Sequence, residues 1–229
     1  MKRPVDVCYL CGESLDADTD RDHVPPAQLY PKQVRTSQAL NLFTLPVHRR
    51  CNASYQHDED YFFSSLSPLA ANSHVGGAIW ADLRRRVTRP EGRRLARQVL
   101  KEFEERPSGV VLPEGKVAKR FDPKRVRRVV WKICRGLFFK VGGRFLPEGV
   151  PRCFWIFLST EKPPPELGLF LAARPRGDHP GVFDYMYIED TGIDNFHFWA
   201  LLFWNTLVTL IAFHDADCRC ARCAGAVGR

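Results

Sequence analysis

Residues 122–143 read DPKRVRRVVWKICRGLFFKVGG and carry the best-defined helical pattern of the chain. Apolar residues recur on one helical face: Val126, Val129, Val130, Ile133, Cys134, Leu137 and Phe138. Basic residues take the opposite face: Lys124, Arg125, Arg127, Arg128, Lys132 and Arg135. Asp122-Pro123 marks the start and Gly142-Gly143 the end. The pattern predicts a helix that packs one side on a core and presents a row of cations on the other.

The regions on either side of this helix differ in character. Upstream, Thr88 and Glu91 have the spacing of a capping box, and Leu95, Val99 and Phe103 share one face, which predicts a helix over about 90–105. Downstream, short aromatic and β-branched runs at 154–158, 169–172, 183–188 and 196–213 predict strands. The last run is expected to be two strands that turn near Asn205. These runs together predict an antiparallel meander.

The 229 residues are therefore expected to form an α+β protein with three segments. Residues 1–66 are turn-rich with small apolar groups, which favours a compact module stabilised by a metal ion. Residues 67–150 form a basic helical segment, and residues 151–229 form a β-rich C-terminal region with a cysteine-rich tail.

The positive charge of the chain is concentrated in its middle. The formal net charge is +8, and residues 67–140 hold 19 basic and 7 acidic residues, a net charge of +12. Cations that contact phosphates release condensed counterions, so this stretch has the charge that binding to the phosphates of a nucleic acid needs. A solvated basic helix face is the alternative interpretation. The candidate nucleic-acid-binding residues are Arg84, Arg85, Arg86, Arg93, Arg94, Lys124, Arg125, Arg127 and Arg128.

The eight cysteines favour metal binding over disulfides. The start MKRPVDVCYL lacks the apolar region of a secretory signal, so we expect a cytoplasmic protein in a reducing compartment. Clustered cysteines there are more often metal ligands. The apolar run at 196–213 contains His197 and Asn205 and is flanked by acidic residues, so no membrane span is expected.

Two ligand pairs predict a structural zinc site. Cys8 and Cys11 form one pair, and His48 and Cys51 form another, each with the two-residue spacer that lets both side chains reach one tetrahedral Zn2+. The alternative is that His48 is an ordinary exposed histidine. The tail carries His214, Cys218, Cys220 and Cys223, which would be either a second zinc site or a terminus with free thiols.

A specific motif lies around these pairs. Asp22-His23-Val24-Pro25-Pro26 stands between them, Asn41-Leu42 precedes the second pair, and Asn52 directly follows Cys51. In this order residues 5–63 resemble the HNH endonucleases, the ββα-metal family. The departure from the family pattern is His48, where most members have cysteine; histidine is also an adequate zinc ligand. The resemblance implies an N-terminal ββα-metal module in which zinc has only a structural role.

These residues suggest a mechanism. The Asp22 carboxylate and the Asn52 carbonyl oxygen suit one hard cation, Mg2+ or Mn2+, with positions left for water and phosphate. His23, neutral near pH 7, would take a proton from the attacking water. The resemblance implies that Asn41 fixes the imidazole of His23. It also implies a metal-dependent endonuclease acting on DNA, with RNA as the second substrate class, in phage defence or a mobile element.

A non-catalytic function is the alternative. Taken singly, Asp22 reads as a turn or cap residue, His23 as a surface histidine and Asn52 as a helix N-cap. The chain would then be a zinc-stapled module that binds nucleic acid or a partner protein. His57, Asp58 and Glu59 read as a solvated helix face or a second metal contact. For a nuclease, cutting both strands would require a homodimer or two successive events, and a regulatory partner protein is a further expected partner.

Overall fold

The computed structural model describes residues 6–37, 41–105, 107–114, 117–170, 173–179, 181–188, 195–215 and 218. It contains both helices and antiparallel sheets, which confirms the α+β class. In chain order the described elements are β1 (Thr19–His23), η2 (Ala27–Leu29), α1 (Lys32–Ser37), β2 (Thr44–His48), α2 (Arg49–Ala53), α3 (Gln56–Leu66), η3 (Ser67–Asn72), α4 (Gly76–Val87), α5 (Pro90–Leu100), β3 (Phe103–Glu104), η4 (Pro107–Gly109), β4 (Ala118–Lys119), α6 (Pro123–Gly142), β5 (Arg152–Leu158), η5 (Pro165–Phe170), β6 (Phe183–Ile188), β7 (Phe196–Phe203) and β8 (Leu207–His214).

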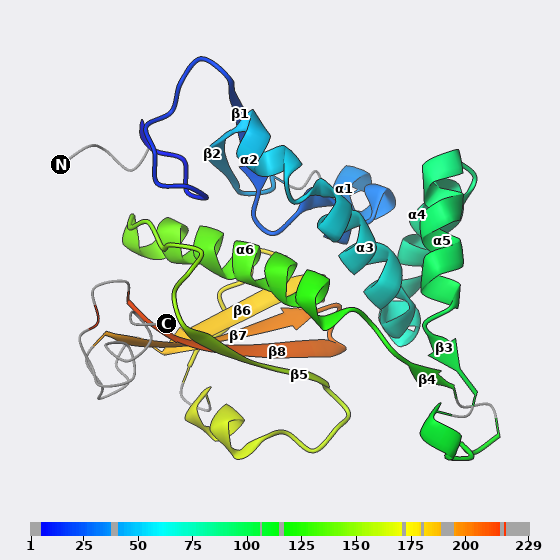
Figure 1. Ribbon diagram of the computed structural model, residues 1–229. Coiled ribbons are helices and arrows are strands. Elements are labelled where there is room, and N and C mark those ends of the chain that lie inside the picture. Colours follow the sequence, from blue (N-terminus) through cyan, green and yellow to red (C-terminus); the bar gives the residue numbers. More distant parts are fainter. Residues whose placement is uncertain are drawn as a thin grey trace.

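Helix α6 lies between the two halves of the molecule (Figure 1). The sheet with strand order β5-β8-β7-β6 covers one side, and the N-terminal elements cover the other. The Asp122 carboxylate accepts hydrogen bonds from the backbone N–H groups of Lys124 and Arg125 and so caps the helix start. Gly143 follows the helix with φ of 63°, a left-handed conformation that glycine adopts without strain. The predicted helix and its end signals are confirmed.

The apolar face of α6 packs on the sheet through aromatic contacts. The ring of Phe213 on β8 meets Trp131 at 5.2 Å and Phe138 at 5.8 Å, both edge to face. Val129 and Val130 are fully buried in the same core. Each such side chain contributes on the order of 1.5–3 kcal/mol by leaving water, so this face fixes the helix to the sheet.

The opposite face of α6 corrects the sequence prediction. Lys132 and Arg135, which we expected in a row of presented cations, are each 1% exposed. The Arg135 guanidinium donates to the carbonyl oxygens of Leu10 and Leu146, the latter at 2.7 Å. Helical periodicity shows which residues share a face, but not that a second module covers that face.

All four strands of the C-terminal sheet match predicted runs, whereas the strand predicted at 169–172 is wrong. Strands β7 and β8 form a hairpin whose turn contains Trp204 and Asn205 at φ of 53° and 56°, as expected for a turn near Asn205. Residues 165–170 instead form the short 3₁₀ helix η5, and residues 171–172 lie outside the described residues. Of the described residues of this run, Phe170 packs on Phe198 and Leu210 of the sheet, while Leu169 is exposed.

The helix expected over 90–105 is shorter than predicted. Helix α5 ends at Leu100, and Phe103 pairs with Lys119 in the two-stranded sheet of β3 and β4. The capping box is also absent among the described contacts: Arg89 is the N-cap residue, and the Thr88 hydroxyl donates to the Arg85 carbonyl. The proline at the first helical position supports the helix start without a side-chain cap.

The N-terminal elements place the sequence motifs close together. Strands β1 and β2 pair antiparallel, with Asp22 opposite Leu45 and His23 opposite Thr44, and α2 and α3 follow directly. One cluster of buried apolar residues runs from Cys8 to Phe213 and includes members of all three predicted segments. No helix within the described ranges combines the length and hydropathy that crossing a membrane requires.

Candidate functional site

Four predicted ligands come together beside the β1–β2 hairpin. The Sγ atoms of Cys8, Cys11 and Cys51 and a ring nitrogen of His48 all lie within 4.8 Å of one another. Cys8 and Cys11 belong to a tight turn that Gly12 completes at φ of 80°, while His48 ends β2 and Cys51 lies on α2. Such a group of thiols and one imidazole can hold a metal ion such as zinc.

The geometry around His48 suits a ligand held through Nδ1. Nδ1 lies 3.3 Å from the Cys11 sulfur, and Nε2 lies 3.1 Å from the carbonyl oxygen of Ser14. A proton on Nε2 would be donated to that carbonyl and would leave the Nδ1 lone pair for a metal. The His48 side chain is buried, so the alternative of an ordinary exposed histidine is wrong.

The thiols of the cluster are costly to ionise without a cation. Burial, followed by the neighbouring Cys8 and Cys11, raises the pKa of Cys51 to about 12. Burial also raises the pKa of Cys11. A bound metal ion stabilises the thiolates directly, so these crowded thiols are consistent with a site that is complete only with its ion.

Asp22 lies in a buried network of charges. Its side chain is 6% exposed, and its Oδ2 atom lies 2.7 Å from the Lys132 ammonium and accepts a hydrogen bond from the Tyr9 hydroxyl. Burial and the Asp22 carboxylate raise the pKa of Tyr9, which therefore stays a donor. Lys132 also donates to the Glu59 carboxylate and lies 3.4 Å from Oδ1 of Asn52.

The position of Lys132 bears on whether this site can hold the divalent ion that the resemblance implies. The oxygens expected to hold Mg2+ belong to Asp22 and Asn52, and both face the ammonium of Lys132. An ammonium and a divalent cation at the same oxygens would repel each other strongly in a buried place. The residues as placed do not fit Mg2+ or Mn2+ in addition to Lys132.

His23 ends β1 on the strand face opposite Asp22. Its ring is half-buried and makes no hydrogen bond with any described residue. Burial lowers the pKa of His23 below its ordinary value; Asp22 acts in the opposite direction, and the charge of Arg35 adds to the lowering. The imidazole is therefore neutral near pH 7 and has a lone pair available.

Arg35 on α1 is a residue that the sequence analysis did not single out. Its Nε atom is buried and has no hydrogen-bond partner among the described residues. Its positive charge acts on His23. A buried guanidinium N–H without a partner is costly, and Arg35 as a whole is only half-buried, so Arg35 is a candidate to bind an anion near His23.

Asn41 and Asn52 are placed differently. Asn41 is exposed before β2, and in the part of the chain that is described no hydrogen bond joins it to His23. Asn52 on α2 is half-buried, and its Nδ2 atom donates to Asp20 at 3.3 Å. The structure thus brings Asn52 to Asp22 through Lys132, but it does not bring Asn41 to the imidazole.

Several predicted nucleic-acid contacts are engaged within the protein. The Asp58 carboxylate pairs with Arg125 at 2.7 Å and with Arg128 at 2.5 Å, and Asp60 pairs with Arg86 at 3.1 Å. Although burial opposes it, hydrogen bonds from the two arginines lower the pKa of Asp58. Asp58 and Glu59 are therefore neither a solvated face nor metal contacts; they hold α3 to α6.

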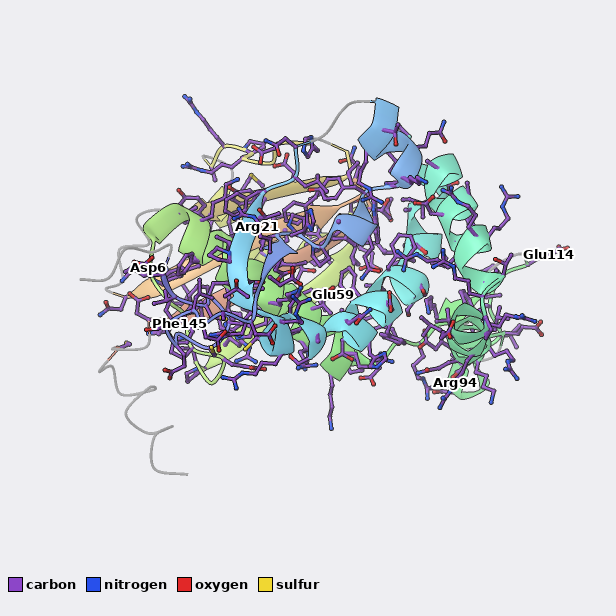
Figure 2. The ribbon with its side chains drawn as sticks, turned by 90° about the horizontal axis from the view of Figure 1, so that it is seen from above. Asp6, Arg21, Glu59, Arg94, Glu114 and Phe145 are labelled. Carbon is purple, nitrogen blue, oxygen red and sulfur yellow. The ribbon has the colours of Figure 1, made fainter. Side chains whose placement is uncertain are left out.

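The remaining predicted cations are exposed. Five of them form no ion pair with any described residue: Arg84, Arg93, Arg94, Lys124 and Arg127. Arg85 is exposed and pairs with Asp82. Figure 2 shows Arg94 at the α5 end of the molecule, well apart from Glu59. The exposed cations are thus spread over α4, α5 and the start of α6 and do not line a single row.

An open hollow lies between α1 and α4. It is lined by Lys32, Gln33, Thr36, Ala81, Arg84 and Arg85 and has a volume of about 740 Å³. The lining is basic, and α1 also carries Arg35. The hollow therefore offers a positively charged surface on the same helix that approaches His23.

Of the second zinc site predicted in the tail, only His214 and Cys218 are among the described residues. His214 Nδ1 lies 3.1 Å from the Cys218 sulfur. Cys220 and Cys223 lie outside the described residues. The two described members are therefore adjacent, and a second zinc site stays a prediction.

Comparison with models of known protein families, with curated proteins and with solved structures finds no match. The assignment of residues therefore depends on the geometry above and on the motifs that carry the resemblance.

The metal cluster predicts a specific effect of losing one ligand. Cys51→Ser should release zinc from the module and lower the thermal midpoint by at least about 5 °C, since 1 kcal/mol corresponds to about 2–4 °C in a chain of this size. Zinc content by a colorimetric chelator and thermal unfolding followed by circular dichroism would measure both effects. Cys153→Ser, at an exposed free cysteine, is the control. Equal zinc content in both variants would argue against the site.

Two neighbouring arginines should separate nucleic-acid binding from stability. Arg84→Ala removes an exposed cation of the hollow, so the DNA binding predicted from the sequence should weaken and its salt dependence should fall by about one phosphate contact. Arg86→Ala removes the ion pair with Asp60 and the contact with the Phe63 ring, so it should cost about 1 kcal/mol of stability. Fluorescence anisotropy at several salt concentrations and urea unfolding would compare them. The same effect of both variants on DNA affinity would contradict this distinction.

Proposed function

We propose that the chain hydrolyses phosphodiester bonds of DNA, with RNA as the second substrate class, and that His23 is the general base. The observation that carries this proposal is the half-buried imidazole of His23, which makes no hydrogen bond with a described residue and whose pKa is lowered by burial and by the charge of Arg35. The order of Cys8, Cys11, Asp22-His23, His48, Cys51 and Asn52, which resembles the HNH endonucleases, supports it.

In the proposed step, His23 accepts a proton from a water molecule as the water oxygen attacks the phosphorus. The bond from phosphorus to the leaving oxygen breaks, and solvent protonates that oxygen. Arg35, whose Nε atom has no partner among the described residues, would pair with a phosphate oxygen and stabilise the charge that develops on it. The metal cluster, whose proposed ion is Zn2+, would hold β2 and α2 together next to this site.

The divalent metal remains outside the proposed step. Mg2+ or Mn2+ between Asp22 and Asn52 is the arrangement that the resemblance implies, but Lys132 contacts both residues. The chain's own residues that act in the step are therefore His23 and Arg35. Three further proposals are drawn from the sequence alone. They are a cytoplasmic location, a context of phage defence or a mobile element, and assembly as a homodimer or with a regulatory partner.

The alternative is a zinc-stapled module that binds nucleic acid without cleaving it. A specific observation favours it: the Asp22 carboxylate, which the resemblance assigns to metal catalysis, is bound by Lys132 and Tyr9. Exposed cations along the basic hollow between α1 and α4 would then account for binding.

Cleavage by matched histidine variants distinguishes the two functions. Plasmid DNA and single-stranded RNA would be incubated with the wild type, His23→Ala and His57→Ala, with and without Mg2+ or Mn2+ and with EDTA as a control. His57 is exposed on α3 and serves as the matched control. We expect His23→Ala to lower the cleavage rate by at least about 100-fold and His57→Ala to leave it unchanged. Equal rates for His23→Ala and the wild type would exclude His23 as the base.

The pH profile gives a second readout of the same residue. The pKa of His23 lies below its ordinary value of 6.5, and the neutral form is the base. Activity should therefore be full at pH 7 and fall only as the pH drops through the lowered pKa. Cleavage rates measured between about pH 4.5 and 8, the range in which histidines titrate, would show this fall in activity at acidic pH. A limb centred above 6.5 would contradict the assignment.

A further inference from the structure

The ammonium of Lys132 is surrounded by oxygens from three different elements. Asp22 Oδ2 on β1 lies at 2.7 Å, Asn52 Oδ1 on α2 at 3.4 Å, and the carboxylate of Glu59 on α3 accepts a hydrogen bond. The Lys132 side chain is 1% exposed. Figure 2 shows Glu59 near the middle of the molecule.

These oxygens form a cradle for one cation. Two carboxylates and an amide oxygen are the hard ligands that Mg2+ prefers in proteins. Two of the three residues, Asp22 and Asn52, are those that the resemblance assigns to a divalent ion. The cradle is closed by Tyr9, whose hydroxyl donates to the same Asp22 oxygen that faces Lys132.

We propose that Lys132 supplies, from α6, the positive charge between Asp22 and Asn52, and that the wild-type chain binds no divalent ion there. This inference concerns the same site as the proposed function. Its link to catalysis rests on that function, whereas the assignment of the positive charge to Lys132 does not. Lys132 is a positioning residue: its buried ammonium cannot reach a substrate, but it fixes Asp22 beside His23.

Replacing the ammonium should convert the cradle into a metal site. Lys132→Met keeps a long side chain but removes the charge, so Asp22, Asn52 and Glu59 are left with uncompensated oxygens. A divalent ion would then neutralise two carboxylates. A lysine with a purely structural role would lower stability when replaced, but it would not produce a gain in metal affinity.

Metal titration of the zinc-loaded full chain tests this directly. Mn2+ binding would be followed by electron paramagnetic resonance for the wild type, Lys132→Met, and Lys132→Met combined with Asp22→Asn. Lys140→Met, at a half-buried lysine of α6 that pairs with Asp178, is the control. We expect Lys132→Met to bind Mn2+ at least about tenfold more tightly than the wild type, and the double variant to lose this gain.

Folding of the variants does not limit the test. If Lys132→Met fails to fold, combining it with Glu59→Gln leaves one buried carboxylate fewer and keeps three oxygen ligands. A second measurement compares Mn2+ binding by the wild type with Mn2+ binding by Asp22→Asn. Saturable Mn2+ binding by the wild type that Asp22→Asn removes would overturn the proposal, as would folded Lys132→Met variants with unchanged affinity.

The two proposals fail in different ways. If His23→Ala cleaves nucleic acid as fast as the wild type, the proposed function of His23 is refuted. The Mn2+ titration would still show whether Lys132 takes the place of the ion. Cleavage that depends on His23, together with Mn2+ bound at Asp22 in the wild type, would support the nuclease and refute the role of Lys132.

Discussion

Acidic side chains of α3 meet basic side chains of α6 where the N-terminal module packs on the rest of the chain. Asp58 binds Arg125 and Arg128, and Glu59 binds Lys132. One face of α6 is therefore apolar and packs on the sheet, while Arg125, Arg128 and Lys132 of its basic side pair with acidic residues of α3. Because α6 contacts the sheet and α3 at once, its position fixes the N-terminal elements that carry the candidate site.

This contact has chemical consequences at β1. Lys132 extends beyond Glu59 to the Asp22 carboxylate, while His23, the next residue, lies on the other face of the strand. At the end of β1, the Asp22 carboxylate is buried and paired with Lys132 on one side of the strand. The His23 imidazole lies on the other side and has no hydrogen-bond partner among the described residues. The group of Cys8, Cys11, His48 and Cys51 beside β1, which could hold a metal ion, brings the turn at Cys8 next to the helix that carries Asn52.

The sequence was sufficient to predict features that depend on local spacing. The ligand pairs around Cys8 and Cys51, the helix capped by Asp122 and the hairpin near Asn205 are all recognised from neighbouring residues. Features that depend on contacts between distant segments were not predictable in this way. The burial of Lys132 requires knowing that α3 and β1 pack on α6. The run at 169–172 has the apolar composition of a strand, although its first two residues end a short 3₁₀ helix.

The pairing between α3 and α6 can be measured as a coupling energy. A double-mutant cycle would combine Asp58→Ala with Arg125→Ala and follow unfolding in urea, since both side chains are less than a quarter exposed, at 15% and 23%. The account predicts a coupling of about 1.5 kcal/mol, above the roughly 0.2–1 kcal/mol expected of a pair exposed to solvent. A coupling within about 0.3 kcal/mol of zero would contradict it, because the module would then be held on α6 by apolar contacts alone.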